Sequence, residues 1–299
     1  MPVQFTGETH GCYSDSLQMV LGEAGPGASL LELLTGSAFG MSAKGKNQPF
    51  FAPRQWTPEW GIDTCLDLLG WTCEHIAGSE QQAVAALAAL DGEQAIFAGP
   101  FDMGLLPYHP GLGQPMGVDH YLAALGTDRE LVVVHDPHGH PYATVPLPKL
   151  LEAWQPDLPF EVMPFNLRTG FRRVRPVEPA DAIRRFLPVA AGLVDPEGSA
   201  AAAELTAKQV ADGLDTPEYF HLADFMVCAG TRRRGDAAVL LGRAGYPELA
   251  AVLDRQARLI GAIELPLVNG DSAAAAAPLR ELAPTFEQLY HELVRAAAA

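Results

Sequence analysis

The chain contains few cysteines and few basic residues for its length, and each scarcity excludes a class of protein. Its 299 residues include 4 Cys, too few for the disulfide framework of a small secreted domain. Lys and Arg number 20 against 36 Asp and Glu, so the formal net charge is −16 at pH 7. Because a chain this acidic repels nucleic acid and anionic membranes, we predict neither as a partner.

Long hydrophobic runs and a basic N-terminal segment are also lacking. The longest apolar runs, such as Ala200–Ala203 and Ala273–Ala277, are short and rich in Ala, and none approaches the roughly 20 residues that span a bilayer. The first eight residues, Met-Pro-Val-Gln-Phe-Thr-Gly-Glu, hold neither a basic stretch nor an apolar run. A chain without a secretory signal is expected to be cytoplasmic.

What the chain does contain is a change of periodicity. Apolar residues recur at helical spacing at 13–22, 29–35, 60–69 and 79–90. Strand-like runs dominate later, at 119–126, 130–135, 142–145, 160–165 and 171–174. Helices followed by strands that look antiparallel predict an α+β unit with segregated layers.

From about Glu178 onward the sequence is predicted to be all-helical. Several of the expected helices open with Pro near the first turn, where a helix tolerates it. We therefore predict a catalytic domain over residues 1–176 and a helical domain over 177–299. Within the latter, Asp271–Ala277 is expected to be a low-complexity linker, and Arg232–Arg234 to end a helix and complement its dipole.

Three residues form an ordered set that points to chemistry. They are Cys12 in His-Gly-Cys-Tyr-Ser, His120 in Val-Asp-His-Tyr-Leu, and Asp136 in Val-Val-His-Asp-Pro. A thiol acts as a nucleophile only as thiolate, and a neighbouring imidazole generates one at neutral pH. A carboxylate then holds the imidazole in the right tautomer and stabilises its cation. The set predicts a thiol-dependent enzyme.

The positions of these residues favour the same interpretation. Cys12 is predicted to begin a helix, where the dipole and backbone N–H groups lower a thiol pKa and can hold an oxyanion. His120 and Asp136 lie at the ends of two strands joined by a short hairpin, so they are expected at the same sheet edge. The other cysteines, Cys65, Cys73 and Cys228, lie among apolar residues and are expected to be structural.

Two further assignments in this region are weaker. Gln4 is the amide available upstream of Cys12 as an oxyanion donor, although Thr9, His10 and the backbone N–H of Cys12 compete for that role. A metal site is the alternative use of the region, because ligand types cluster within a few residues. The candidate ligands are His135, Asp136, His138 and His140. No CxxC pair or HExxH motif accompanies them, and we predict no metal and no cofactor.

An Arg-rich segment offers a local basic surface on this acidic chain. Residues 168–185 hold six Arg against Glu178 and Asp181. We expect Arg172, Arg173 and Arg175 to form a patch for an acidic partner or a phosphate, although a solvated surface with internal ion pairs accounts for the same pattern.

Several short motifs occur in a fixed order and resemble those of a known family. They are His-Gly-Cys-Tyr-Ser-Asp-Ser-Leu (10–17), Leu-Leu-Thr-Gly-Ser-Ala-Phe-Gly (33–40), Val-Asp-His-Tyr-Leu (118–122), Val-Val-Val-His-Asp-Pro (132–137) and Leu-Leu-Glu-Ala-Trp (150–154). Over about residues 8–165 the chain resembles papain-like cysteine peptidases of the bacterial C39-peptidase-like version. Within that group it most resembles the butirosin biosynthesis protein H N-terminal family.

This resemblance implies a papain-like core, with N-terminal helices packed on an antiparallel sheet. It also implies Cys12 as nucleophile, His120 as base and Asp136 as orienter. The namesake moves an aminoacyl group from a carrier-protein thioester to an amine of an antibiotic. The chain departs from the family at Gly11, between His10 and Cys12, and in its helical C-terminal half.

We therefore expect a cysteine-dependent acyltransferase of antibiotic-type metabolism. The expected donor is an acyl carrier protein or a small-molecule thioester, and the expected acceptor is an amine or a hydroxyl, with or without ring closure. A cytosolic peptidase, amidase or thioester hydrolase using the same three residues is the first alternative. A non-catalytic or metal-binding protein on the same fold is the second.

Overall fold

A computed structural model describes most of the chain, and it divides into two compact units. Unit 1 comprises residues 1–28 and 70–175, and unit 2 comprises residues 29–69 and 176–299. The described residues are 4–7, 10–44, 48–92, 94–109, 113–128, 130–158 and 161–298.

Unit 1 is built on a six-stranded sheet of order β3-β8-β4-β5-β6-β7. Every neighbouring pair in it is antiparallel, which confirms the predicted α+β class. The strands are β3 (Trp71–Ile76), β4 (Ile96–Asp102), β5 (Asp119–Asp128), β6 (Leu131–Asp136), β7 (His140–Pro146) and β8 (Leu167–Arg173).

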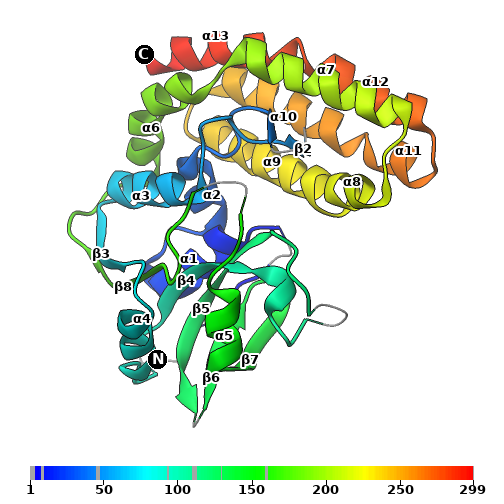
Figure 1. The fold of residues 1–299 in the computed structure, drawn as a ribbon. Helices are drawn as coiled ribbons and strands as arrows, with labels where there is room; N and C mark the ends of the chain where they lie inside the picture. Colours follow the sequence, from blue (N-terminus) through cyan, green and yellow to red (C-terminus); the bar gives the residue numbers. More distant parts are fainter. Residues whose placement is uncertain are drawn as a thin grey trace. The chain divides into compact units, whose positions relative to one another are not determined.

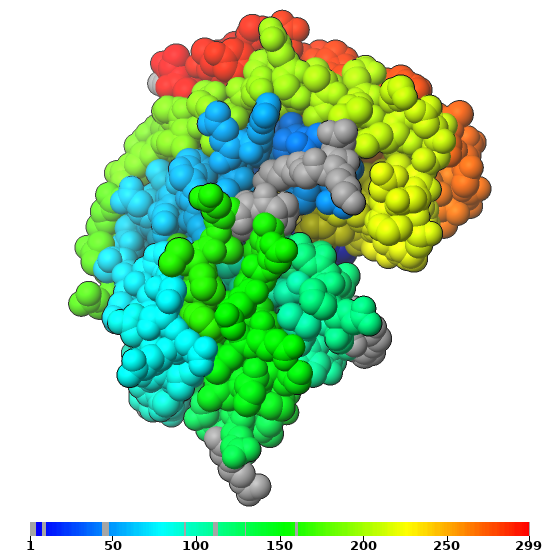
Figure 2. Space-filling model, in the orientation of Figure 1, coloured from blue at the N-terminus to red at the C-terminus, as the bar shows by residue number. Residues whose placement is uncertain are grey.

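Alternating residues of the central strands explain how helices cover both faces of this sheet. Leu122 and Val134 belong to one core cluster, together with residues of α4 (Glu80–Ala88) and α5 (Leu147–Ala153). Ala123, one residue along from Leu122, packs instead with Met19 of α1 (Cys12–Leu21). Successive strand residues point to opposite faces, so α1 covers the face opposite α4 and α5 (Figure 1). The green segment that includes α5 lies on the viewed surface of unit 1 in Figure 2.

Several local predictions in unit 1 hold and one is wrong. The β5–β6 hairpin pairs Asp128 with Leu131, as expected, and the Ser79 hydroxyl caps α4 by accepting from the backbone N–H of Gln82 at 3.3 Å. The predicted strand at 160–165 is wrong, because residues 161–166 contain no strand. The strand that follows is β8, which begins earlier than the predicted residue 171.

Among the described residues of unit 2, the regular structure is helical apart from one small hairpin, which agrees with the predicted helical C-terminal region. The hairpin pairs β1 (Ser42–Lys44) with β2 (Gln48–Phe50). Residues 29–69 belong to this unit, whereas the predicted domains grouped them with the sheet. Its helices are α2 (Ala28–Thr35), α3 (Pro58–Leu69), α6 (Pro179–Leu193), α7 (Pro196–Asp212), α8 (Thr216–Phe220), a π-helix (His221–Met226), α9 (Val227–Arg243), α10 (Pro247–Gly261), α11 (Glu264–Val268), α12 (Ser272–Leu282) and α13 (Thr285–Ala297).

Two expectations for unit 2 are wrong for identifiable reasons. The expected linker at 271–277 forms the start of α12, because Asp271 caps the helix by accepting from the backbone N–H of Ala274 at 3.0 Å and Ala is the best helix former. Arg232–Arg234 do not end a helix, since α9 continues to Arg243. Arg233 and Arg234 are buried inside the unit. In the described part of the chain, no helix has the length and apolar character that crossing a membrane requires.

Candidate active site

Cys12 is the first residue of α1, and that helix is fixed to the strand that carries His120. The hydroxyl of Ser16 donates to the backbone carbonyl of Tyr121 at 3.0 Å. The ring of Tyr13 meets the ring of Tyr121 edge-on, with centroids 6.1 Å apart. Both contacts join the first turns of α1 to the residue that follows His120. They explain how residues distant in sequence come together.

The N-terminus of α1 is suited to anionic groups. Its N-cap residue is Gly11, which has no side chain to accept from the first backbone N–H groups. The partial positive charge of a helix N-terminus therefore lies beside the Cys12 sulfur. An oxyanion formed there would find backbone donors.

His120, at the start of β5, and Asp136, at the end of β6, form a buried ion pair. The Nε2 atom of His120 lies 2.7 Å from Oδ1 of Asp136, as the predicted hairpin implied. Cys12 also acts on this imidazole, since hydrogen bonding with its thiol and its charge contribute to raising the pKa of His120. Because Nε2 is used by Asp136, the nitrogen left for the thiol is Nδ1. The three side chains predicted as a catalytic set are therefore joined through His120, whereas their catalytic roles stay a prediction.

Opposing effects decide the protonation of this pair. Burial lowers the pKa of His120. The charge of Asp136 and its hydrogen bond raise that pKa, as do the hydrogen bond and charge of Cys12, and the net result is a pKa of about 10. For Asp136, burial raises the pKa, but the charge of His120 and hydrogen bonds from His109, His120 and the His138 backbone hold it far below its usual range. The pair is thus an imidazolium and a carboxylate at neutral pH.

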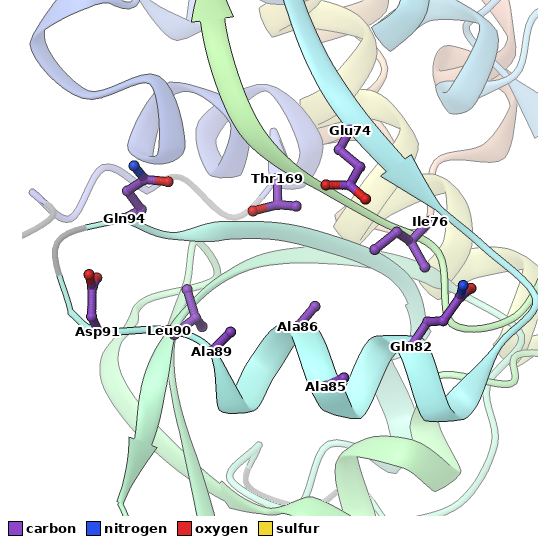
Figure 3. Close-up of a pocket in the computed structure, with 10 residues that line it drawn as sticks. All are labelled: Glu74, Ile76, Gln82, Ala85, Ala86, Ala89, Leu90, Asp91, Gln94 and Thr169. Carbon is purple, nitrogen blue, oxygen red and sulfur yellow. The ribbon is translucent and has the colours of Figure 1, made fainter.

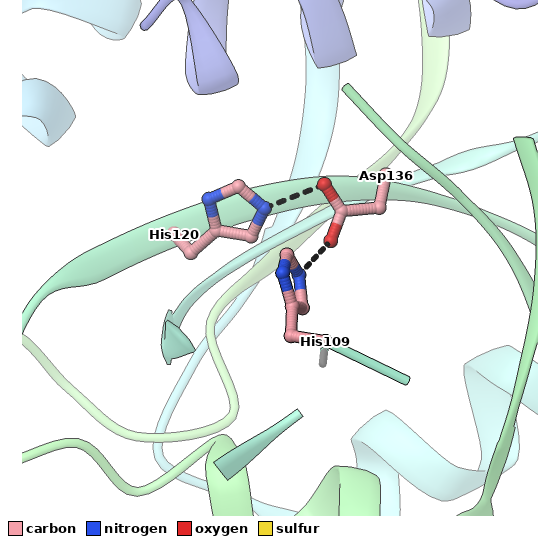
Figure 4. A group of neighbouring side chains, drawn as sticks. All are labelled: His109, His120 and Asp136. Atoms are coloured by element: carbon pink, nitrogen blue, oxygen red, sulfur yellow. Dashed lines mark hydrogen bonds and ion pairs between the residues drawn. The ribbon is translucent and has the colours of Figure 1, made fainter. Parts of the chain in front are cut away.

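Asp136 has further partners that the sequence analysis missed. The Nε2 atom of His109 lies 2.9 Å from its Oδ2 atom, and the hydroxyl of Tyr108 donates to the same oxygen at 2.9 Å. In Figure 4 the two imidazoles each direct one ring nitrogen at a different carboxylate oxygen. The backbone N–H of His138 donates to Oδ1 at 2.8 Å. In the sequence, the sign of these partners is the pair Tyr108-His109 inside a loop. Such a pair does not by itself indicate a contact with Asp136.

The segment that carries His109 is held by a buried carboxylate. Asp102 ends β4 and accepts hydrogen bonds from the backbone N–H groups of Gly104 at 2.9 Å, Met116 at 3.0 Å and Gly117 at 2.9 Å. A Cβ at Gly104 would lie 2.1 Å from the carbonyl oxygen of Gln114, so only glycine fits there. The loop ends are therefore fixed, although residues 110–112 lie outside the described part of the chain.

The metal-ligand set that the structure supports differs from the predicted one. The ring of His135 packs against Phe5 and Tyr142, and its Nδ1 accepts from the backbone N–H of Tyr142 at 3.1 Å. Neighbouring strand residues face opposite sides of a sheet, so His135 is directed away from Asp136. Among the described residues, the group whose ligand atoms lie within 4.8 Å of one another is His109, His120 and Asp136.

The remaining predicted site residues lie on the surface. Gln4 is exposed, and its oxyanion role stays a prediction. Arg172, Arg173 and Arg175 are exposed as expected for a basic patch. Arg168, in the same Arg-rich segment, is buried on β8 and cannot contribute to that surface.

The other cysteines differ from Cys12 in their surroundings. Cys65 is fully buried, and burial, followed by the charge of Glu32, raises the pKa of its thiol. Burial also raises the pKa of Cys228, with smaller contributions from Glu264 and Asp224. A raised pKa disfavours the thiolate, which agrees with the predicted structural role of these two residues.

A groove elsewhere in unit 1 has no part in this site. It lies between α4 and the strands β3 and β8, and has a volume of about 520 Å³. Figure 3 shows Ala85 and Ala86 of α4 and its C-cap residue Ala89 on one side, and Glu74 and Thr169 on the other. Neither Cys12, His120 nor Asp136 lines it, so its size does not make it the candidate active site.

Comparison with known proteins assigns the chain a different relative from the one its motifs resembled. A family model described as the YobF C-terminal domain matches residues 194–294. The chain is similar to YobF. It is 27% identical over 309 residues to "Uncharacterized protein YobF" of Bacillus subtilis (strain 168), covering 97% of this chain and 98% of the relative.

This similarity corrects the family expected from the sequence. The butirosin biosynthesis protein H assignment is wrong, because the relationship that extends over nearly the whole chain, including the helical half that the motifs left unmatched, is to YobF. The antibiotic-type setting depended on that resemblance and has no other support.

Proposed function

We propose that this chain is a cysteine-dependent acyltransferase, with unit 1 as a papain-like core. The observation that carries the proposal is the position of His120, buried between the thiol of Cys12 and the carboxylate of Asp136. A Cys at a helix N-terminus, with His and Asp on neighbouring antiparallel strands, supports the papain-like comparison. A thiolate activated in this way is suited to acyl chemistry.

The first half-reaction acylates Cys12. In the starting state the proton of the Cys12 thiol has already passed to His120, and the thiolate attacks the acyl carbon of a thioester donor. A carbon–sulfur bond to Cys12 forms, and the carbonyl oxygen becomes an oxyanion beside the N–H groups that begin α1. As the bond to the donor sulfur breaks, that sulfur takes the proton from His120. Asp136 stabilises the imidazolium throughout and keeps its own charge.

The second half-reaction returns the enzyme to its starting state. An acceptor amine or hydroxyl attacks the acyl group on Cys12 and gives its proton to His120. The bond between the acyl carbon and Cys12 then breaks, and the thiolate–imidazolium pair is restored. The donor we propose is a carrier protein or a small thioester, since the exposed Arg172, Arg173 and Arg175 of the same unit offer a basic surface for an acidic partner.

Intact-protein mass spectrometry tests this proposal directly. Wild type, Cys12→Ala and His120→Ala are incubated with an acyl thioester, with Cys73→Ala as a matched control because Cys73 is a half-buried thiol of the same unit. We expect one acyl adduct on wild type and Cys73→Ala, and none on Cys12→Ala. Consumption of the adduct by added amines supports transfer. An equal adduct on Cys12→Ala contradicts the proposal.

Hydrolysis is the alternative outcome for the same residues. If the adduct disappears at the same rate with and without any amine or alcohol, water is the acceptor and the protein is a thioester hydrolase, amidase or peptidase. An amide substrate that acylates Cys12 as fast as a thioester favours the peptidase or amidase.

A metal-binding role is the second alternative, favoured by the close approach of His109, His120 and Asp136. The nitrogen and oxygen atoms concerned are already hydrogen-bonded to one another, which explains their spacing without an ion. Metal analysis of purified protein, together with the reactivity of Cys12→Ala, distinguishes the roles. Stoichiometric metal and a Cys12→Ala variant of unchanged activity would favour this alternative.

A further inference from the structure

Both oxygens of the Asp136 carboxylate accept hydrogen bonds, and these bonds determine how the carboxylate is oriented toward His120. Oδ1 accepts from Nε2 of His120 at 2.7 Å and from the backbone N–H of His138 at 2.8 Å. Oδ2 accepts from Tyr108 and His109, each at 2.9 Å. An ionised carboxylate offers about four acceptor positions, so these donors fill them.

We propose that His109 is a positioning residue, whose hydrogen bond to Oδ2 fixes the Asp136 carboxylate in the orientation that Oδ1 needs to hold His120. The inference rests on the proposed function, since it assigns His109 a role in activating Cys12. His109 does not reach the thiol in this scheme. It acts through Asp136 and His120.

Burial makes this orientation sensitive to loss of the His109 donor. The Asp136 side chain has no exposed surface and that of His109 is 4% exposed, so water cannot easily replace the imidazole. Without His109, Oδ2 keeps the donor from Tyr108 but has one buried acceptor position unfilled. Rotation of the carboxylate toward another donor would relieve that deficit and move Oδ1 away from His120.

The two donors to Oδ2 are not equivalent. Burial, the charge of Asp136 and the hydrogen bond to it raise the pKa of Tyr108 well above its usual value, so its hydroxyl stays protonated and donates at every working pH. His109 can donate only if its proton is on Nε2. Its ring packs against those of His138, His140 and His120, with centroids 5.4, 4.6 and 5.9 Å away, which holds the plane of the imidazole.

Alkylation of Cys12 by iodoacetamide measures the activated thiol without any substrate, and three variants isolate the His109 bond. His109→Phe keeps an aromatic ring but removes the donor, whereas His109→Gln keeps an amide N–H. We expect the alkylation rate at pH 7 to fall roughly tenfold in His109→Phe, since this variant loses one buried hydrogen bond to Asp136. His109→Gln should restore most of that rate. His75→Ala, which removes an imidazole of the same unit that bonds to Asn166 and not to Asp136, should stay within about twofold of wild type.

Thioester acylation of the same variants adds a second readout. His109→Phe should lower kcat with little change in KM, because the imidazole acts on Asp136 rather than on the donor. The proposal is overturned if His109→Phe alkylates like wild type, if His109→Gln is as slow as His109→Phe, or if His75→Ala is equally slow.

A measurement on wild-type protein keeps the inference testable if the variants fail to fold. In protein labelled with ¹⁵N-histidine, long-range ¹H–¹⁵N spectra report which ring nitrogen carries the proton. We expect both His109 and His120 to carry a proton on Nε2. A His109 imidazole with a bare Nε2 atom cannot donate to Asp136 and would overturn the inference. If no thioester acylates wild type, the acyltransferase proposal fails, while alkylation and tautomer still decide the role of His109.

Discussion

Both units bury charge, but with partners of different chemistry. In unit 1, the carboxylate of Asp136 is surrounded by imidazole and phenol groups that can exchange protons. In unit 2, the guanidinium of Arg234 is fully buried and donates to the backbone carbonyls of Gly40 and Gly230 and to the amide oxygen of Gln256. Those acceptors are neutral and do not titrate.

The difference indicates which buried charge is suited to chemistry and which to architecture. Burial, followed by the charge of Arg233, lowers the pKa of Arg234 to about 9, yet the guanidinium stays protonated at neutral pH. The Nε atom of Arg233 lies 2.8 Å from the Oε1 atom of Glu32. A guanidinium held by carbonyl groups from several segments ties those segments together, whereas an imidazole between a thiol and a carboxylate can move a proton.

The largest effect should come from removing the charge of Asp136. In Asp136→Asn, burial is no longer opposed by a carboxylate, so the pKa of His120 should fall and the imidazolium should be lost at neutral pH. We expect Cys12 acylation to slow by roughly 10³-fold, measured as the rate of adduct formation. Asp119→Asn is the matched control, since Asp119 adjoins His120 in sequence on the same strand. Similar rates in the two variants would show that the carboxylate of Asp136 has no special role.

The strand pairing that brings His120 and Asp136 together could be predicted from the sequence, whereas the other groups that contact Asp136 could not. Hydrophobic alternation and the short hairpin predicted that β5 and β6 would bring His120 and Asp136 to one sheet edge, because register follows from local sequence. The helix of Cys12 was likewise predictable from its periodicity. These features depend on neighbours along the chain.

His109 and the assignment of residues 29–69 to unit 2 could not be predicted in that way. His109 reaches Asp136 through a loop fixed by Asp102, and the loop's Gly and Pro content indicates irregular structure without specifying its path. Arg233 and Arg234 were expected to end a helix and complement its dipole, and their burial is unusual because arginine is rarely buried. Several of their partners, Glu32, Gly40, Phe51 and Trp56, lie far away in sequence, and no local pattern encodes such distant contacts.

The same ion pair should give the stability of the protein a defined pH dependence. His120 has a folded-state pKa raised from 6.5 to about 10, so its contribution is fully present below pH 6.5 and is lost as the pH rises through about 10. Asp136 has a lowered pKa, so its contribution is present above pH 3.8 and is lost at lower pH. Between pH 3.8 and pH 6.5 both contributions are fully present. We expect the unfolding free energy of wild type to exceed that of Asp136→Asn by about 3 kcal/mol in this range. Urea unfolding at pH 6 and pH 10 measures this, and a difference that grows with pH would contradict it.

A change to Arg234 should separate stability from chemistry. Arg234→Met preserves much of the side-chain volume but leaves the carbonyl of Gly40 and the amide of Gln256 without their buried donor. We expect the unfolding free energy to fall by about 2 kcal/mol, measured by urea unfolding, while the rate of Cys12 alkylation in the folded protein stays at the wild-type value. A loss of Cys12 reactivity under conditions where the variant is folded would show that the buried guanidinium also affects the site in unit 1.

The smallest effect we expect concerns the bond that ties α1 to β5. Ser16→Ala removes the hydroxyl that donates to the Tyr121 carbonyl at 3.0 Å and should cost about 1 kcal/mol of unfolding free energy. Because Tyr121 follows His120 directly, the variant should also slow Cys12 alkylation, by roughly threefold. Ser14→Ala is the control, since its hydroxyl donates to Gly11 within the first turn of α1. Equal alkylation rates in the two variants would mean that packing of Tyr13 against Tyr121 is sufficient to align Cys12 with His120.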